Sequence, residues 1–411
     1  MSKIPDDVIA DCLLLLPVKP LLRFRCLSKP FCSLIDDPDF IHRHLSRSLN
    51  TRSNFILILR DWNLYTVDFD TLSVAAPPTP RLLVHPLQKG GGTEAFGSCN
   101  GLLALRNSER DLAFFNPLTR KFRRLPVSEI ELPDRNAKAG YVFYGFAYDS
   151  VNEDYKLVRM ATFVAEDERC ESFDYEYEVK VYSLRNDSWK IIKGLPNYLR
   201  FLHKPFYQVL HRRGYGVYAC NALHWVMPHW PELGVKNSII AFDVVSETFR
   251  QVSPSQCWDK KSNCVVDVAA LEGRLCAMCN YGQECIDLWV MKEYGVEESW
   301  SRIFSFRPTK WISSLLFLRP LGYSKDGEKM LLEVNDHKLV WYDLNKASVK
   351  TVKMQGGPKS FGAEICVGSL VPLADDMETE KQQKEAQEKE ITKEHTVMRE
   401  DFLSVGFKLK L

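Results

Sequence analysis

A degenerate repeat runs through most of this chain, from about Asn54 to Val371, and limits the fold more than any other feature. In each copy a short apolar strand ends in a polar turn, and a second strand returns to a basic or apolar end. The copies read LYTVDFDTLSVA, AFFNPLTRKFRRLP, VYSLRNDSWKIIKGLP, AFDVVSETFRQVSP, LWVMKEYGVEESWSRIF and LVWYDLNKASVKTVK. Six copies over about 320 residues give roughly 53 residues each, close to the length of a propeller blade. The repeat therefore predicts an all-β, six-bladed, kelch-like β-propeller.

Short β runs bounded by turn signals support this interpretation, for example Phe55–Leu59 and Leu223–Met227. We expect the ring to close through a strand near Ala363–Val371 that pairs with the first blade, because closure shields the sheet edges. The pattern leaves one alternative open, an unclosed domain of several sheets with the same hairpins.

The first 49 residues differ from the rest, because prolines divide them into short apolar segments. Pro5 suits a first helical position, Pro17 ends the first helix, and Asp37-Pro38 breaks the chain before a last helical segment. Domains of this size are marginal on their own, yet this one holds more apolar residues than its core needs. The sequence therefore indicates a small all-α module whose remaining apolar face belongs to a partner protein. A helical cap on the following domain is the alternative.

The order of these signals resembles the F-box. Ile4-Pro5-Asp6-Asp7 corresponds to the opening Leu-Pro with acids, Leu16-Pro17 to the central Leu-Pro, and Asp37-Pro38-Asp39-Phe40 to the closing Asp-Pro-x-Phe. Arg25-Cys26-Leu27-Ser28-Lys29 corresponds to the Arg-x-x-Ser-Lys. Leu15 stands where the pattern has Arg, and Phe31 where it has Trp, so both departures keep or raise apolar character.

This resemblance implies a binding partner, a Skp-type adaptor that joins the chain to the cullin and RING subunits of a ubiquitin ligase. The residues expected to contact the adaptor are Ile4, Pro5, Ile9, Leu13, Leu16, Pro17 and Leu21.

The body resembles the F-box-associated interaction domain of plant F-box proteins, in the phrases GSCNGLLAL, FNPLTRKFRRLP and YGFAYDSVNEDYKLVRM. We therefore expect an F-box at residues 1–49, a substrate-binding propeller at 52–372 and a tail at 373–411. The tail is dense in Glu, Lys and Gln, a composition typical of a solvated helix or a disordered segment.

Within that family, FGSCNGLLAL, HRRGYGV, MKEYGVEESW and DFLSVGFKLKL resemble a member that restrains plant defence. This resemblance implies that the targets are nucleotide-binding leucine-rich-repeat immune receptors, which would be ubiquitinated and degraded by the proteasome.

Composition excludes several partner classes. The formal net charge is +1, which argues against nucleic acid or an anionic membrane held by bulk charge. No apolar run approaches the roughly 20 residues of a transmembrane helix, and the acidic N-terminus is unlike a secretory signal. The 12 cysteines show no framework spacing. Reduced thiols in the cytoplasm and nucleus are therefore expected.

A search for catalytic chemistry predicts no enzyme, no cofactor and no metal. Cys276 and Cys279 form a lone C-x-x-C, but residues three apart on a strand point to opposite faces. His224, beside Trp225, is expected to be a hydrogen-bonded histidine inside a blade.

Two segments combine aromatic and cationic residues, the combination that anchors many protein interfaces. They predict substrate contacts, with packing between blades as the alternative. The residues are Phe201, His203, Phe206, Tyr207 and Trp230.

Three functions follow. The first is the substrate receptor of a Skp–cullin–F-box ubiquitin ligase. The second is a propeller enzyme with a helical cap, and the third is an F-box scaffold that degrades nothing.

Overall fold

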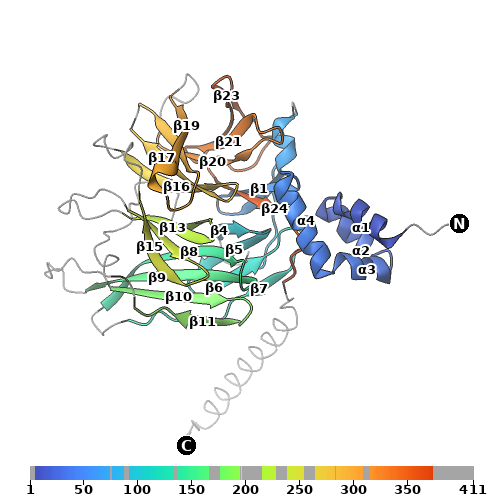
Figure 1. Ribbon diagram of the computed structural model, residues 1–411, viewed down its shortest axis with the longest axis horizontal. Coiled ribbons are helices and arrows are strands. Elements are labelled where there is room, and N and C mark those ends of the chain that lie inside the picture. The colour runs from blue at the N-terminus through green and yellow to red at the C-terminus, as the bar shows by residue number, and fades with distance from the viewer. Residues whose placement is uncertain are drawn as a thin grey trace, which may run out of the picture.

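A helical module packs against one side of a larger β domain in the computed structural model (Figure 1). The structure describes residues 5–74, 76–87, 92–132, 137–165, 176–194, 196, 215–227, 238–253, 264–282, 284–308 and 315–373. The predicted tail lies outside them, apart from Leu373. Among the described helices, none combines the length and apolar character needed to cross a bilayer.

The module contains four helices, which the prolines of the sequence separate. Pro17 precedes the second helix, Ser28 accepts a hydrogen bond from the Phe31 amide at the start of the third, and Asp37 accepts from Asp39 and Phe40 at the start of the fourth. These caps satisfy amides that a helix leaves unpaired. The helices are α1 (Asp6–Leu14), α2 (Val18–Arg25), α3 (Lys29–Ile35) and α4 (Pro38–Asn50).

The β domain consists of antiparallel strands arranged around a central axis. Four separate sheets have four strands each, and one sheet has eight. The first separate sheet contains β24 (Gly362–Val367), β1 (Phe55–Arg60), β2 (Leu64–Asp68) and β3 (Arg81–Leu82), and the second contains β4 (Glu94–Cys99), β5 (Leu102–Ser108), β6 (Asp111–Phe115) and β7 (Phe122–Arg124). The third contains β16 (Val265–Leu271), β17 (Arg274–Asn280), β18 (Ile286–Met291) and β19 (Trp300–Phe306). The fourth contains β20 (Leu318–Tyr323), β21 (Lys329–Val334), β22 (Lys338–Asp343) and β23 (Ser348–Thr351).

The eight-stranded sheet has two antiparallel halves. One half contains β8 (Ala137–Asp149), β9 (Asp154–Ala165), β10 (Glu176–Ser183) and β11 (Ser188–Ile191). The other contains β12 (Tyr215–Ala219), β13 (Ala222–Met227), β14 (Ser238–Asp243) and β15 (Thr248–Val252). Two short 3-10 helices lie in the separate sheets: η1 (Phe69–Ser73) connects β2 to β3, and η4 (Glu297–Ser299) connects β18 to β19.

The prediction of a six-bladed propeller is therefore wrong, because within the described residues four blades are separate four-stranded sheets and the other eight strands form one sheet. A short parallel pairing joins the two halves of the fifth sheet, with Gly145 beside Gly216. A Cβ on Gly145 would lie 2.7 Å from Leu223, and one on Gly216 would lie 2.6 Å from the Trp225 ring. Glycine at both positions therefore leaves room for the Leu223 and Trp225 side chains of β13, which pack against this pairing.

The predicted closing strand is confirmed. β24 pairs with β1 from Phe55–Val367 to Arg60–Gly362, so the last described strand completes the first sheet. At this seam Gly101 has a φ of +85°, and a Cβ there would overlap the Ser369 hydroxyl oxygen. Only glycine avoids both the strained backbone and the overlap.

Buried hydrophobic clusters fill the spaces between neighbouring sheets and hold the ring together. Phe69 of η1 and Trp341 of β22, for example, meet at a ring-centroid distance of 5.8 Å. Repeated apolar residues on the strands therefore build a series of hydrophobic clusters around the ring.

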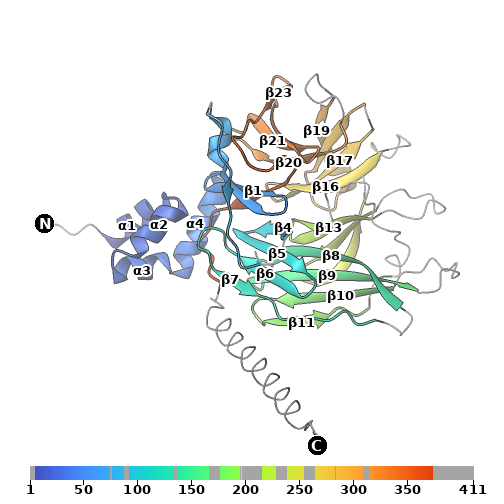
Figure 2. The ribbon, with the colours of Figure 1, turned by 180° about the vertical axis from the view of Figure 1, so that it is seen from behind.

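Helix α4 joins the module to the propeller (Figure 2). Leu45 packs with Val367 and Val371, while Leu370 lies in the module's own hydrophobic cluster. The Gly368 amide also donates to the Asn54 carbonyl at 2.6 Å. Buried side chains thus hold the module against the β domain.

Candidate functional site

Two regions of the described chain can bind a partner, and their chemistry differs. One is an apolar stripe on the helical module, and the other is a cavity along the propeller axis.

The stripe consists of Val8, Cys12 and Leu15, spaced four and three residues apart in α1 and at its end, so they share one helix face. Val8 is 50% exposed and Leu15 is 60% exposed, and Cys12 is exposed. Leu27, which follows α2, is 68% exposed. We call Val8, Cys12 and Leu15 the α1 stripe. It was not predicted from the sequence, although the spacing was a usable signal.

The structure divides the predicted adaptor contacts into three groups. Pro5 and Pro17 are exposed, and Ile9 and Leu16 are half-buried. Leu13 and Leu21 are buried in the module's own core, where they pack with other helices. Ile4 lies outside the described residues. The adaptor role of these seven residues remains a prediction, but Leu13 and Leu21 clearly support the module itself.

Polar contacts hold α1 in place beneath the stripe. His44 of α4 lies 2.9 Å, through Nε2, from the Leu16 carbonyl oxygen, and burial lowers the pKa of this histidine. Arg43 of α4 forms an exposed ion pair with Asp11 at 3.0 Å. Because α4 also packs on the propeller, the stripe has a defined orientation relative to the β domain.

A motif that the resemblance singled out also has a structural role. Arg25 donates to both carboxylate oxygens of Asp36, at 2.6 and 2.8 Å, linking α2 to the end of α3. The hydrogen bond from Arg25 holds the pKa of Asp36 below its usual value.

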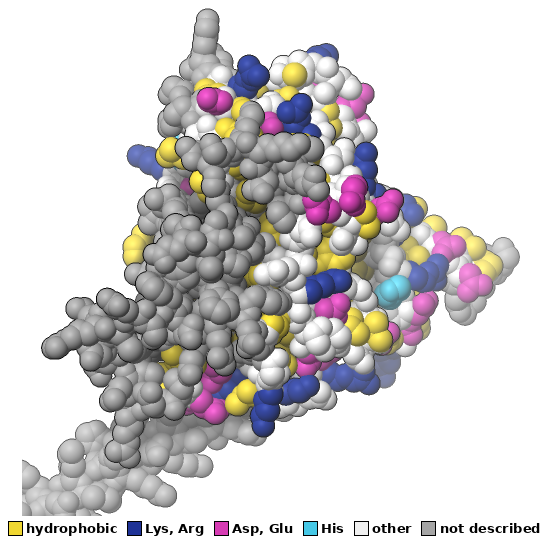
Figure 3. All heavy atoms as spheres, turned by 60° about the vertical axis from the view of Figure 1, so that its left-hand side comes forward, with side chains coloured by type: hydrophobic (Ala, Val, Ile, Leu, Met, Phe, Trp, Pro, Cys, Tyr) yellow, Lys and Arg dark blue, Asp and Glu magenta, His cyan; other side chains and the backbone are white. Residues whose placement is uncertain are grey.

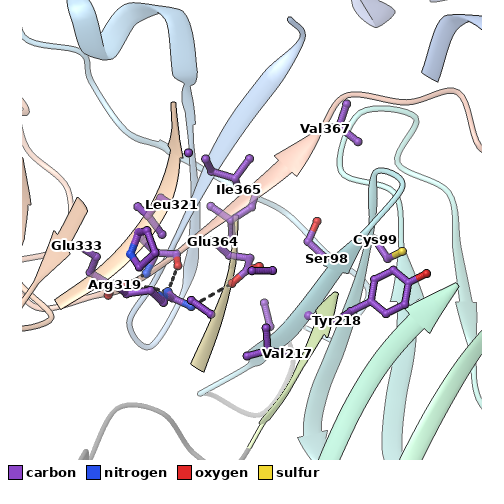
Figure 4. A pocket seen from close by; sticks show the side chains of 18 of the residues that line it. Ser98, Cys99, Val217, Tyr218, Arg319, Leu321, Glu333, Glu364, Ile365 and Val367 are labelled. Atoms are coloured by element: carbon purple, nitrogen blue, oxygen red, sulfur yellow. Dashed lines mark hydrogen bonds and ion pairs between the residues drawn. The ribbon is translucent and has the colours of Figure 1, made fainter. Parts of the chain in front are cut away.

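The propeller axis contains a cavity of about 680 Å³. Residues of the inner strands line this space, among them Gly97, Gly216 and Ala269. Figure 4 shows labelled side chains from several strands around it, including Ser98, Val217 and Ile365. A cavity of this size is within the range of small-ligand sites.

Charged groups inside the cavity are arranged in pairs. Arg319 donates to Glu333 at 2.6 Å and to Glu364 at 3.3 Å (Figure 4). Although burial lowers the pKa of Arg319, the two carboxylates raise it overall. At another part of the lining, Arg52 pairs with Glu272 and lies 5.2 Å from the Tyr323 ring centroid. Positive and negative side chains alternate, so the cavity presents no surface of one sign.

The outer surface is mixed as well. Lysine and arginine side chains lie among aspartates and glutamates over the described part of the face in Figure 3. A partner there would be recognised by shape and specific contacts more than by bulk charge.

The five predicted substrate contacts, Phe201, His203, Phe206, Tyr207 and Trp230, lie outside the described residues. Their role remains a prediction.

Two structural predictions are confirmed. His224 is buried, with Nε2 2.6 Å from the Tyr294 hydroxyl and Nδ1 3.2 Å from the Val217 carbonyl. Cys276 and Cys279 point into different hydrophobic clusters on either side of their sheet. Within the described part of the chain, no group of three His, Cys, Asp or Glu residues is placed to hold a metal ion.

Comparison with known proteins identifies the class. The family described as F-box associated beta propeller domain matches residues 56–371, and the F-box domain matches residues 1–43. The chain therefore belongs to the F-box proteins that carry an F-box-associated β-propeller.

Two relatives from Arabidopsis thaliana align with the whole chain over their whole length. F-box protein CPR1 is 45% identical, and F-box protein At4g22390 is 38% identical. The resemblance found in the phrases of the sequence is thus confirmed. Among solved structures, an oligogalacturonate lyase from Vibrio parahaemolyticus covers 75% of this chain and 76% of its own, at 11% identity and a TM-score of 0.40.

Proposed function

We propose that this chain is the substrate receptor of a Skp–cullin–F-box ubiquitin ligase. The observation that carries the proposal is the exposed α1 stripe on an F-box that is packed firmly against a propeller. An apolar helix face suits burial by an adaptor protein. The propeller would bind the target, and the chain itself would catalyse no bond change.

The packing of the F-box against the propeller supports this role. A receptor acts by raising the effective concentration of a target lysine near the charged conjugating enzyme. That effect is largest when adaptor and target are held at a fixed separation. The contacts of Leu45 with Val367 and of Leu370 with the F-box core provide such a connection.

We further propose that the targets are nucleotide-binding leucine-rich-repeat immune receptors, whose degradation would restrain plant defence. Full-length similarity to F-box protein CPR1 supports this choice. The proposed location is the cytoplasm and nucleus, where both an adaptor and such receptors would be accessible.

The adaptor assignment can be tested with one charge in the stripe. Replacing Leu15 by Asp in the full chain should weaken binding of a purified Skp-type adaptor at least 100-fold, because a carboxylate would be buried at the interface. Val151→Asp is the matched control, since Val151 is a 70% exposed aliphatic residue of the propeller. Equal adaptor binding by both variants would refute the site.

The degradative role needs a separate measurement. Ubiquitination of a candidate immune receptor should require the intact chain, adaptor, cullin and RING subunits together, and should disappear with Leu15→Asp. If the target binds but its half-life is unchanged when the chain is removed, the chain is a non-degradative F-box scaffold.

A further inference from the structure

The end of the described chain lies at the F-box. Residues after β24 run between the two domains, where Asn116 donates to the carbonyls of Ser369 and Val371. Leu370 contributes to the hydrophobic cluster of the F-box, and Leu373 is buried in a cluster with Leu45. Residues 374–411 therefore begin beside the helical module.

Residues Leu403–Leu411, which lie outside the described structure, have a regular sequence pattern. From Leu403 to Leu411 every second residue is apolar, with Ser404, Gly406, Lys408 and Lys410 between them. In an extended chain, alternate side chains lie on opposite faces. This segment thus has one fully apolar face and one polar face with two lysines.

The α1 stripe is as long as a part of that face, and acidic residues lie near it. Val8 and Leu15 are seven residues apart, which is about 10 Å along a helix and about three residues of a strand. Asp7 and Asp11 are exposed residues of the same helix, and Asp11 also pairs with Arg43 of α4 at 3.0 Å, so acidic groups lie beside the stripe. Two lysines on the incoming segment would be attracted to them.

The spacer is long enough. Residues 375–400 would span about 28 Å as a flexible coil or about 39 Å as a helix. The longest helix of the module, α4, has 13 residues, or about 20 Å. The C-terminal segment can therefore reach every helix of the F-box from Leu373.

We propose that the C-terminal segment Leu403–Leu411 covers the α1 stripe when no adaptor is bound, and that the adaptor must displace it. The identity of the displacing partner, a Skp-type adaptor, rests on the proposed function. The contact between the segment and the stripe does not require the adaptor. It assigns the stripe a second occupant, namely a segment of the same chain.

Tethering makes a weak contact sufficient. A short linker gives an effective concentration on the order of millimolar. If the intrinsic Kd of the segment is about tenfold lower than this effective concentration, the segment occupies the stripe in roughly nine molecules of ten. The apparent affinity for the adaptor is then about tenfold weaker.

Cys12 lies inside the stripe and reports coverage without any adaptor. Its alkylation rate should rise at least threefold when Phe402–Leu411 is deleted, relative to the half-buried Cys32 of α3 in the same molecule. The double variant Val405→Asp/Phe407→Asp should reproduce the increase, because it disrupts the apolar face. Ser404→Asn, on the polar face, should leave the rate unchanged.

Adaptor affinity provides the second test. The deletion should bind a Skp-type adaptor about tenfold more tightly than the full chain, and a peptide of residues 400–411 should reverse the gain. Unchanged Cys12 labelling after the deletion would overturn the inference even if the adaptor binds. Coverage that depends on protein concentration would also overturn it, because the segment would come from a second copy. Cys12 protection without any adaptor binding would support the contact and refute the proposed function.

Discussion

The α1 stripe and the axial cavity differ in the polarity of their residues and in how many of those residues already have a partner. The stripe is apolar and sits on a small helical module, so its side chains remain uncovered in the described structure. The cavity is lined by small residues and paired charges, and its arginines already have partners. The stripe therefore suits a partner that buries hydrophobic area, whereas the cavity lining is largely satisfied and supports the fold.

The largest difference in stability is expected between removing the cation of a buried ion pair in the cavity and removing the cation of an exposed ion pair in the F-box. Arg319→Met would leave Glu333 buried without its cation and should lower the free energy of unfolding by about 3–5 kcal/mol. Arg43→Met breaks an exposed pair in the F-box and should cost less than about 1 kcal/mol. Denaturant unfolding of both variants measures the contrast, and a loss for Arg319→Met as small as that expected for Arg43→Met would show that the cavity charges do not stabilise the propeller.

The next contrast separates the core of the F-box from its stripe. Leu21 is fully buried in the module, so Leu21→Ala should cost about 2–5 kcal/mol and unfold the helices. Leu15→Ala removes an exposed side chain and should change stability by less than about 0.5 kcal/mol. Both should weaken adaptor binding, but only the first should reduce helical circular dichroism. Loss of helicity in both would mean that the stripe is part of the core.

Two glycines test the closing seam of the propeller. Gly101→Ala would place a Cβ onto the Ser369 hydroxyl oxygen at a positive φ, and should cost about 2–4 kcal/mol. Gly273 also has a positive φ, but a Cβ added there would meet nothing within 4 Å, so Gly273→Ala should cost about 1 kcal/mol. Thermal unfolding distinguishes them. Equal shifts would indicate that backbone strain alone, rather than crowding at the seam, sets both costs.

The last contrast concerns pH. Burial lowers the pKa of His224 from 6.5 to about 4, so below pH 6.5 the unfolded chain binds a proton that the folded chain does not. Stability should fall as pH drops from 6.5 towards 4, by at most roughly 3 kcal/mol from this residue. His224→Gln should flatten that part of the curve for the propeller while leaving the F-box unaffected. An unchanged slope would assign the acid sensitivity to other groups.

Much of the architecture could be read from local patterns. The repeat predicted the outer hairpins, for example β6–β7 and β14–β15, because a strand, a turn and a returning strand are encoded within about a dozen residues. The closing strand was also predictable, since a ring of this kind needs one. The joining of two blades was not, because it depends on Gly145 and Gly216, which are far apart in sequence.

The binding surfaces were less predictable. Periodicity marked Leu13, Leu16 and Leu21 as apolar helix residues, but it could not tell which of them the module would bury for itself. Their exposure depends on where α4 and Leu370 pack, and those contacts come from opposite ends of the chain.

The class of the chain, its two domains and its strand and helix segments follow from the residue order alone, because caps, prolines and alternating apolar residues act over a few neighbours. Three features required the folded chain: that the stripe is Val8, Cys12 and Leu15, that the axial charges are paired, and that the chain beyond Leu373 starts at the F-box. These features arise from packing between distant segments, and packing depends on the shape of the whole core.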